Sequence, residues 1–114
     1  MSVKMTTRQV GDVTVIDAVG KITLGDGASS FRETIRSLNG SGQKKLLLNL
    51  AEVSYIDSSG IGEMVSGFTT VANQGGVLKL LNLNKRVKDL LQITKLYTVF
   101  EVFDDESAAV RSFA

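Results

Sequence analysis

The sequence contains no cysteine, no histidine, no proline and no tryptophan among its 114 residues. Without cysteine the chain has no disulfide and no thiol nucleophile, and without cysteine and histidine the usual ligands of a zinc site are missing. A Ser-His-Asp triad and a histidine acid–base pair are excluded for the same reason. These absences remove most of the common catalytic centres that one small domain can build from its own side chains.

Charge and hydropathy are also unremarkable in either direction. Lysine and arginine number 13 and aspartate and glutamate 12, so the net charge is +1 and lacks the strong basic excess typical of nucleic-acid binding. No run approaches the ~20 apolar residues of a membrane-spanning helix, and residues 1–10 lack the apolar segment of a secretory signal. We therefore expect a cytoplasmic protein with no membrane span and no direct contact with nucleic acid.

The length and the apolar fraction of 43% predict one globular domain over residues 1–114, with a core of ordinary size. Strands are predicted at residues 3–10, 13–19, 44–50, 77–83 and 97–103. Helices are predicted at residues 28–38 and 61–72, after Asn84 as N-cap, and from the acidic residues 104–106 onward. Loops are expected at residues 21–27 and 51–57. The order ββαβαβαβα predicts an α/β fold, with an opening hairpin, a mixed sheet of four to five strands and about four helices.

The segment that begins the longest predicted helix is the best candidate for a functional site, and it reads Asp57-Ser58-Ser59-Gly60-Ile61-Gly62. Ser58 or Ser59 is expected to cap the helix, and ordinary capping without any further role is the alternative interpretation. A glycine costs roughly 1 kcal/mol relative to alanine inside a helix. Two of them in the first turn indicate that a backbone or a partner comes close. A phosphoryl group on a serine here would lie beside the positive end of the helix dipole.

Several catalytic templates do not fit. A nucleophile elbow needs glycine two residues before the serine, where the chain has Ile56 or Asp57. The glycines and lysines at residues 40–45 lack the spacing of a phosphate loop, and Val65 replaces the third glycine of a dinucleotide fingerprint. A receiver domain with Asp57 as the phosphorylated aspartate is disfavoured, because the acidic pair and the lysine that such domains need are missing. We expect no catalytic residue, no metal site and no cofactor.

Two further features bear on partners. The basic stretch at residues 85–88 predicts the solvated face of a short helix, with a partner-binding role as the alternative. It follows a strand of the same predicted sheet, so we expect it to lie near the serine segment. Met64 and Phe68 are predicted to belong to the core, although Met64 is close enough to the helix start to be partly exposed and to serve as a contact.

The element order and the Asp57–Gly62 motif together resemble the STAS domain, in particular the single-domain anti-sigma-factor antagonists of bacteria. The resemblance extends over about residues 3–113. It implies a regulatory protein and not an enzyme, which binds an anti-sigma factor that is also a serine kinase. Phosphorylation by that kinase releases the antagonist, and a phosphatase of the PP2C type resets it. The resemblance implies Ser58 as the phosphorylated residue. We also expect a monomer when the protein is free.

The resemblance also implies a set of partner-binding residues around the serine: Thr23, Asp57, Ser59, Gly60, Ile61, Gly62 and Met64. Asp57 is expected to orient the serine loop or its contact with the kinase. One departure stands out, because many family members carry Gly-x-Leu/Ile-Asp after the second strand and this chain has the uncharged Thr23 in place of the aspartate. The alternative interpretation is an unphosphorylated STAS scaffold or a transport-associated interaction subunit.

Overall fold

An opening hairpin followed by three strand–helix–strand crossovers builds one five-stranded sheet in the computed structural model, which describes residues 3–113. The strands are β1 (Val3–Val10), β2 (Val13–Ile22), β3 (Lys45–Ile56), β4 (Val77–Leu81) and β5 (Val102–Phe103). The helices are α1 (Asp26–Gly40), α2 (Ser58–Asn73), α3 (Lys85–Ile93) and α4 (Glu106–Arg111), with a 3-10 turn η1 (Leu96–Thr98) before β5. This order confirms the predicted ββαβαβαβα fold.

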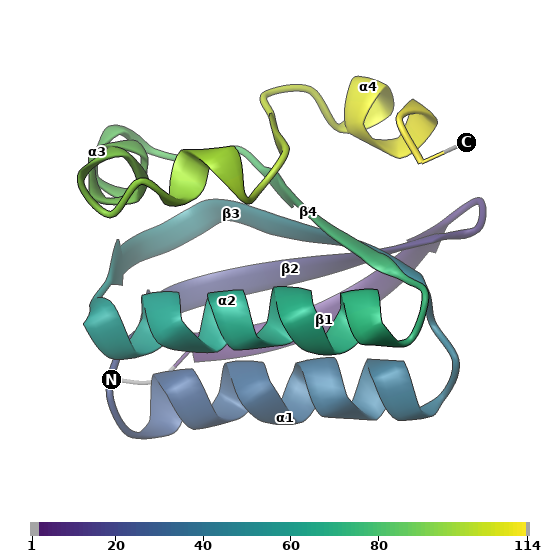
Figure 1. Ribbon diagram of the computed structural model, residues 1–114, viewed down its shortest axis with the longest axis horizontal. Coiled ribbons are helices and arrows are strands. Elements are labelled where there is room, and N and C mark those ends of the chain that lie inside the picture. The colour runs from purple at the N-terminus through teal and green to yellow at the C-terminus, as the bar shows by residue number, and fades with distance from the viewer. Residues whose placement is uncertain (1–2, 114) are drawn as a thin grey trace.

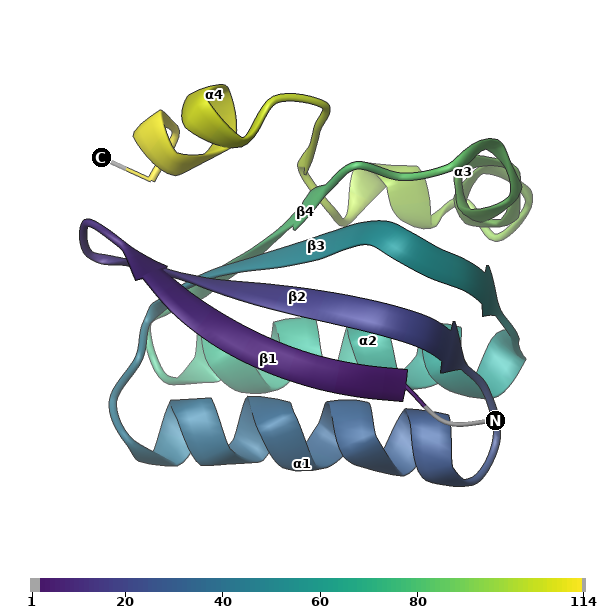
Figure 2. The same ribbon diagram turned by 180° about the vertical axis from the view of Figure 1, so that it is seen from behind.

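The sheet is mixed and its strands lie in chain order. β1 pairs antiparallel with β2, and all the later pairs are parallel. Helices α1 and α2 lie side by side against one face of the sheet (Figure 1). On the other side, α4 lies near the hairpin and α3 near the end of β3, as the view from behind also shows (Figure 2). Within residues 3–113 no helix combines the length and the apolar character needed to cross a bilayer.

The central strand β3 contributes to both faces of the sheet. Leu46 and Leu48 belong to the core that includes residues of α1 and α2, whereas Leu47 belongs to the core under α4. All three are fully buried, as expected for a strand covered on both sides. The prediction of a buried central strand from this leucine run is therefore confirmed.

Several predicted boundaries shift by a few residues, and two predictions are wrong over a whole segment, which the pairing of the strands explains. The expected loop 51–57 is the second half of β3, because β2 continues to Ile22 and pairs with β3 as far as Ile56. The last strand was predicted over residues 97–103 but contains only two residues, Val102 and Phe103. These two pair with the last two residues of the short strand β4, and the preceding residues form η1 instead.

Because β4 ends at Leu81, the second half of β3 has no strand beside it on that side, and α3 takes the place. Asn84 makes this possible. Its side-chain oxygen accepts a hydrogen bond from the backbone N–H of Val87 at 2.9 Å, and its side-chain nitrogen donates to the carbonyl of Val53 at 2.7 Å. The prediction of Asn84 as N-cap is confirmed, and the same residue holds the start of α3 against β3.

Candidate functional site

The start of α2 is capped by Asp57, the first residue after β3. Asp57 has an extended backbone, and its Oδ1 accepts a hydrogen bond from the backbone N–H of Gly60 at 2.9 Å. The prediction that Ser58 or Ser59 caps this helix is therefore wrong. The three residues in a row can all act as caps, and the helix begins at Ser58 because β3 runs on to Ile56 and delivers Asp57 to the capping position.

The second oxygen of the same carboxylate reaches a different loop. Asp57 Oδ2 accepts a hydrogen bond from the backbone N–H of Leu24 at 2.9 Å. The Leu24 and Gly60 amides hold the pKa of Asp57 below its ordinary value, because both donate to the ionised carboxylate. Asp57 is thus a charged clamp that joins the loop after β2 to the first turn of α2.

Gly60 and Gly62 serve different purposes. Gly60 is buried, and a side chain there would collide with the backbone carbonyl of Ile22 and with the side chain of Ile56. The expected close approach is therefore confirmed for Gly60, and the approaching backbone is that of β2 in the same chain. Gly62 is exposed and faces open space, so packing within residues 3–113 does not require a glycine there.

The site residues predicted on α2 divide between surface and core. Ser58 is exposed and Ser59 half-buried. Ile61 is 7% exposed and Met64 is fully buried, because both lie on the face of α2 that packs into the core. The expectation that Met64 is partly exposed and available as a contact is therefore wrong.

Thr23, on the neighbouring loop, is half-buried, and its carbonyl accepts a hydrogen bond from the N–H of Ala28 at 2.8 Å. Next to it Leu24 carries the Asp57 contact, so the structure does bring the Thr23 loop and the serine segment together. The side chain of Leu24 is 79% exposed. Sequence patterns did not identify Leu24 as a site residue, since a single leucine in a loop carries no periodic signal.

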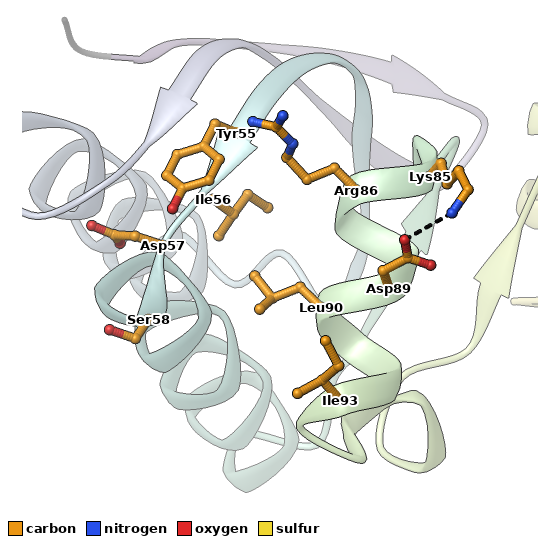
Figure 3. Close-up of a pocket in the computed structure, with 9 residues that line it drawn as sticks. All are labelled: Tyr55, Ile56, Asp57, Ser58, Lys85, Arg86, Asp89, Leu90 and Ile93. Carbon is orange, nitrogen blue, oxygen red and sulfur yellow. Dashed lines mark hydrogen bonds and ion pairs between the residues drawn. The ribbon is translucent and has the colours of Figure 1, made fainter.

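An open groove of about 630 Å³ runs beside Ser58. One wall comes from the end of β3 and the start of α2, and the other from α3 (Figure 3). The lining residues are Tyr55, Ile56, Asp57, Ser58, Lys85, Arg86, Asp89, Leu90 and Ile93. The predicted proximity of the basic stretch to the serine segment is confirmed, because Lys85 and Arg86 lie across the groove from Ser58.

The two basic side chains of α3 that line this groove differ in their contacts. Lys85 Nζ pairs with Asp89 Oδ2 at 3.0 Å, one helical turn away. The guanidinium of Arg86 lies over the ring of Tyr55, 5.5 Å from its centroid. Ile93 at the end of the groove is 78% exposed, and sequence patterns did not assign it to the site.

The arrangement presents the exposed residue Ser58 at the edge of the groove. Both oxygens of Asp57, the nearest carboxylate along the chain, accept hydrogen bonds from backbone amides. Within residues 3–113 no group of three histidine, cysteine, aspartate or glutamate side chains is placed to hold a metal ion. The described geometry places an exposed serine on a capped helix start, next to a groove lined by apolar residues and by charged residues of both signs.

Comparison with known proteins gives this geometry a context. The family model of the STAS domain matches residues 4–109. The anti-sigma-B factor antagonist of Bacillus subtilis is 33% identical over 102 residues, which cover 90% of this chain and 92% of that protein.

Two solved structures show the same fold. An anti-sigma factor antagonist from Mycobacterium paratuberculosis has a TM-score of 0.87 at 15% identity, covering 98% of this chain and 94% of that one. The phosphorylated form of the Bacillus cell fate determinant SpoIIAA has a TM-score of 0.75 at 19% identity, covering 97% of this chain and 100% of that one. At these identities the two structures bear on the fold alone.

Proposed function

The chain belongs to the STAS domain family, and from this membership we propose that it is an anti-sigma factor antagonist controlled by phosphorylation of Ser58. In this proposal the unphosphorylated protein binds an anti-sigma factor that is also a serine kinase. The kinase transfers the γ-phosphoryl group of ATP to the Ser58 hydroxyl, and the phosphorylated protein dissociates. A phosphatase of the PP2C type then restores the free hydroxyl. The relative from Bacillus subtilis, an anti-sigma-B factor antagonist by name, supports this assignment.

The observation that carries the proposal is that Asp57, and not Ser58, caps α2. Asp57 caps α2, so the neighbouring serine is exposed and its hydroxyl is not needed for the cap. A kinase can therefore modify Ser58 without removing the interaction that holds the helix start. The positive end of the α2 dipole favours the added negative charge.

Release follows from electrostatics at the contact surface. A phosphoryl group adds roughly −1.5 to −2 charges and three acceptor oxygens. An interface fitted around a neutral hydroxyl has no compensating groups for this charge, so binding would bury it unpaired. Because Asp57 and Gly60 tie the serine segment to β2 and to its loop, the fold is expected to stay the same. The switch then acts through the choice of partner.

In this mechanism the chain contributes a substrate hydroxyl and a docking surface, while the kinase provides ATP and the general base. The chain is accordingly a regulatory binding protein without catalytic residues of its own. The control of a sigma factor implies a cytoplasmic location, and the proposed switch requires only a monomer.

One observation favours a second candidate, an unphosphorylated STAS scaffold. Thr23 stands where the resemblance to this family implies an aspartate beside the serine loop, and the Leu24–Asp57 contact holds that loop in place. If kinase recognition depended on a carboxylate at position 23, this chain would escape phosphorylation and would serve only as a binding module.

The deciding experiment incubates the purified chain with ATP, Mg²⁺ and each anti-sigma factor of the source organism in turn. Tryptic cleavage releases residues 46–79 as one peptide, in which fragment masses locate any phosphate. Acid-stable phosphate on Ser58, lost in Ser58→Ala and retained in the neighbouring control Ser59→Ala, is expected. Binding to an anti-sigma factor without phosphate on the chain would instead establish the scaffold. Phosphate that forms with ATP alone would exclude the requirement for a separate kinase.

A further inference from the structure

The groove beside Ser58 exposes more apolar than polar surface. Ile56 and Tyr55 form one side, and Leu90 and Ile93 project from α3 toward them (Figure 3). Ile93 is 78% exposed, and Tyr55 is 39% exposed. An exposed isoleucine alone is ordinary, but its position at the end of an apolar groove next to the proposed phosphorylation site indicates a surface that a partner covers.

Arg86 is the cation that this groove offers to a partner. Arg86 stacks over the Tyr55 ring, and within residues 3–113 no carboxylate forms an ion pair with it. Lys21 is the register partner of Tyr55 on the adjacent strand, is exposed, and has no such ion pair among the same residues. Two carboxylates also line the groove: Asp89 pairs with Lys85, and Asp57 keeps its negative charge while it accepts two amide hydrogen bonds.

We propose that the groove between α2 and α3 binds an acidic, apolar segment of the partner protein, with a carboxylate at Arg86 and an aliphatic side chain against Leu90 and Ile93. This inference rests on the proposed function, because it assigns the chemistry of the partner at the same site. Charge complementarity selects the occupant: the planar guanidinium of Arg86 can donate two parallel hydrogen bonds to one carboxylate.

The same arrangement explains how one phosphoryl group would release the partner. Ser58 lines the groove that the acidic segment occupies. A phosphate on Ser58 adds negative charge at the edge of this groove and repels the carboxylates of the partner. Binding of the unphosphorylated form and release of the phosphorylated form then follow from one set of charges.

A second copy of this chain is the main competing occupant. Residues 102–106 read Val-Phe-Asp-Asp-Glu, which is itself an acidic segment that begins with apolar residues. If a second copy used it to fill the groove, the free protein would be a dimer at micromolar concentration. Light scattering on the purified chain tests this outcome, and a dimer that Arg86→Glu dissociates would overturn the assignment to a different protein.

The preference of the groove for acidic segments can be measured without the partner protein, by titration with two short synthetic peptides that are capped at both ends. One carries leucines flanked by glutamates, and the other has lysine in place of each glutamate. In NMR titrations the acidic peptide is expected to shift the amide signals of Tyr55, Leu90 and Ile93 and to bind about tenfold more tightly than the basic one. Equal binding of both peptides, binding elsewhere or no saturable shift would overturn the proposal.

Matched variants separate the groove from the rest of α3. Arg86→Glu and Ile93→Ser are each expected to weaken binding of the acidic peptide about tenfold. Lys88→Glu makes the same change of charge on the same helix, but Lys88 is exposed beside Leu83 and Tyr97 and does not line the groove. It is expected to bind like the wild type. Amide spectra of each free variant show that the fold is retained.

The same variants, tested against the anti-sigma factor found by the phosphorylation experiment, distinguish the two proposals. If Ser58→Asp abolishes binding and Arg86→Glu does not change it, the switch stands and the groove assignment is wrong. If Arg86→Glu weakens binding and phosphorylated Ser58 does not, the groove stands and the phosphorylation switch is wrong.

Discussion

The carboxylate of Asp57 accepts a hydrogen bond from the backbone N–H of Leu24, 33 residues away along the chain, at 2.9 Å. With its other oxygen it caps α2 through Gly60. One side chain therefore holds both the backbone of the exposed Leu24 and the first turn of α2, where Ser58 lies. Asp57 thus contributes two of the contacts that hold together the loops that the proposed partner would meet.

Removal of the clamp gives the first prediction. Asp57→Ala is expected to lower the melting temperature and to accelerate hydrogen exchange at the Leu24 and Gly60 amides, because both donors lose their acceptor. Asp57→Asn keeps one amide oxygen and is expected to protect one of the two amides better than Asp57→Ala does. Asp89→Ala, which breaks an exposed pair on α3, serves as the control. Unchanged protection of Leu24 in Asp57→Ala would show that the contact is not formed in solution.

The lowered pKa of Asp57 makes its contribution depend on pH. The group is more acidic in the folded than in the unfolded state, so its stabilisation is present above the unfolded pKa of about 3.9 and is lost as the pH falls through the lower, folded pKa. The pKa values of Asp17 and Glu106 are also lowered, in both cases chiefly by hydrogen bonds from Arg8, so the whole protein loses stability in acid.

The contribution of Asp57 to this pH dependence is measured as a difference in the free energy of unfolding between wild type and Asp57→Asn. Urea denaturation at several pH values gives this difference. This difference is expected to be largest near neutral pH and to shrink as the pH falls below about 4. A difference that is constant from neutral pH into acid would contradict the role of the ionised carboxylate.

Gly60 and Gly62 lie in the same turn of α2 but have different surroundings, so the same substitution at each tests the close approach of β2. Gly60→Ala is expected to destabilise the protein by about 1–3 kcal/mol, because the new methyl group collides with the carbonyl of Ile22 in β2. Gly62→Ala has open space and gains helix propensity, so it is expected to stabilise the protein by up to about 1 kcal/mol. Chemical denaturation of both variants measures the two effects. Equal effects would mean that the close approach of β2 to α2 is not maintained.

The order of elements could be predicted from the sequence because it depends on local patterns. The leucines at residues 46–48 indicated a buried strand, and the spacing of Ile61, Phe68 and Val71 indicated a helix. Both are present in the structure. Local patterns also identified Asn84 as a cap, since it directly precedes that helix.

The details of the site depended on contacts between distant residues, which local patterns do not contain. Three potential caps stand in a row at residues 57–59, and the choice of Asp57 follows from the length of β3, which its pairing with β2 determines. Met64 is buried because of the way α2 is rotated against the sheet, which periodicity at the helix start defines poorly. The Leu24–Asp57 contact and the groove beside α3 likewise arise only in the folded chain.

The final prediction concerns the switch itself. Ser58→Ala keeps the capped helix start, since Asp57 provides the cap, and it is expected to bind the anti-sigma factor as tightly as the unphosphorylated wild type whether or not ATP is present. Ser58→Asp places a negative charge where the proposed partner approaches and is expected to weaken binding at least about tenfold, more strongly at low than at high salt. Titration calorimetry at two salt concentrations measures both, with Ser54→Asp, an exposed position earlier on β3 that does not line the groove, as the control for added charge. Equal affinities for the wild type, Ser58→Ala and Ser58→Asp would rule out phosphorylation of Ser58 as the event that separates the two proteins, because a charge at the contact surface that costs no affinity cannot cause release.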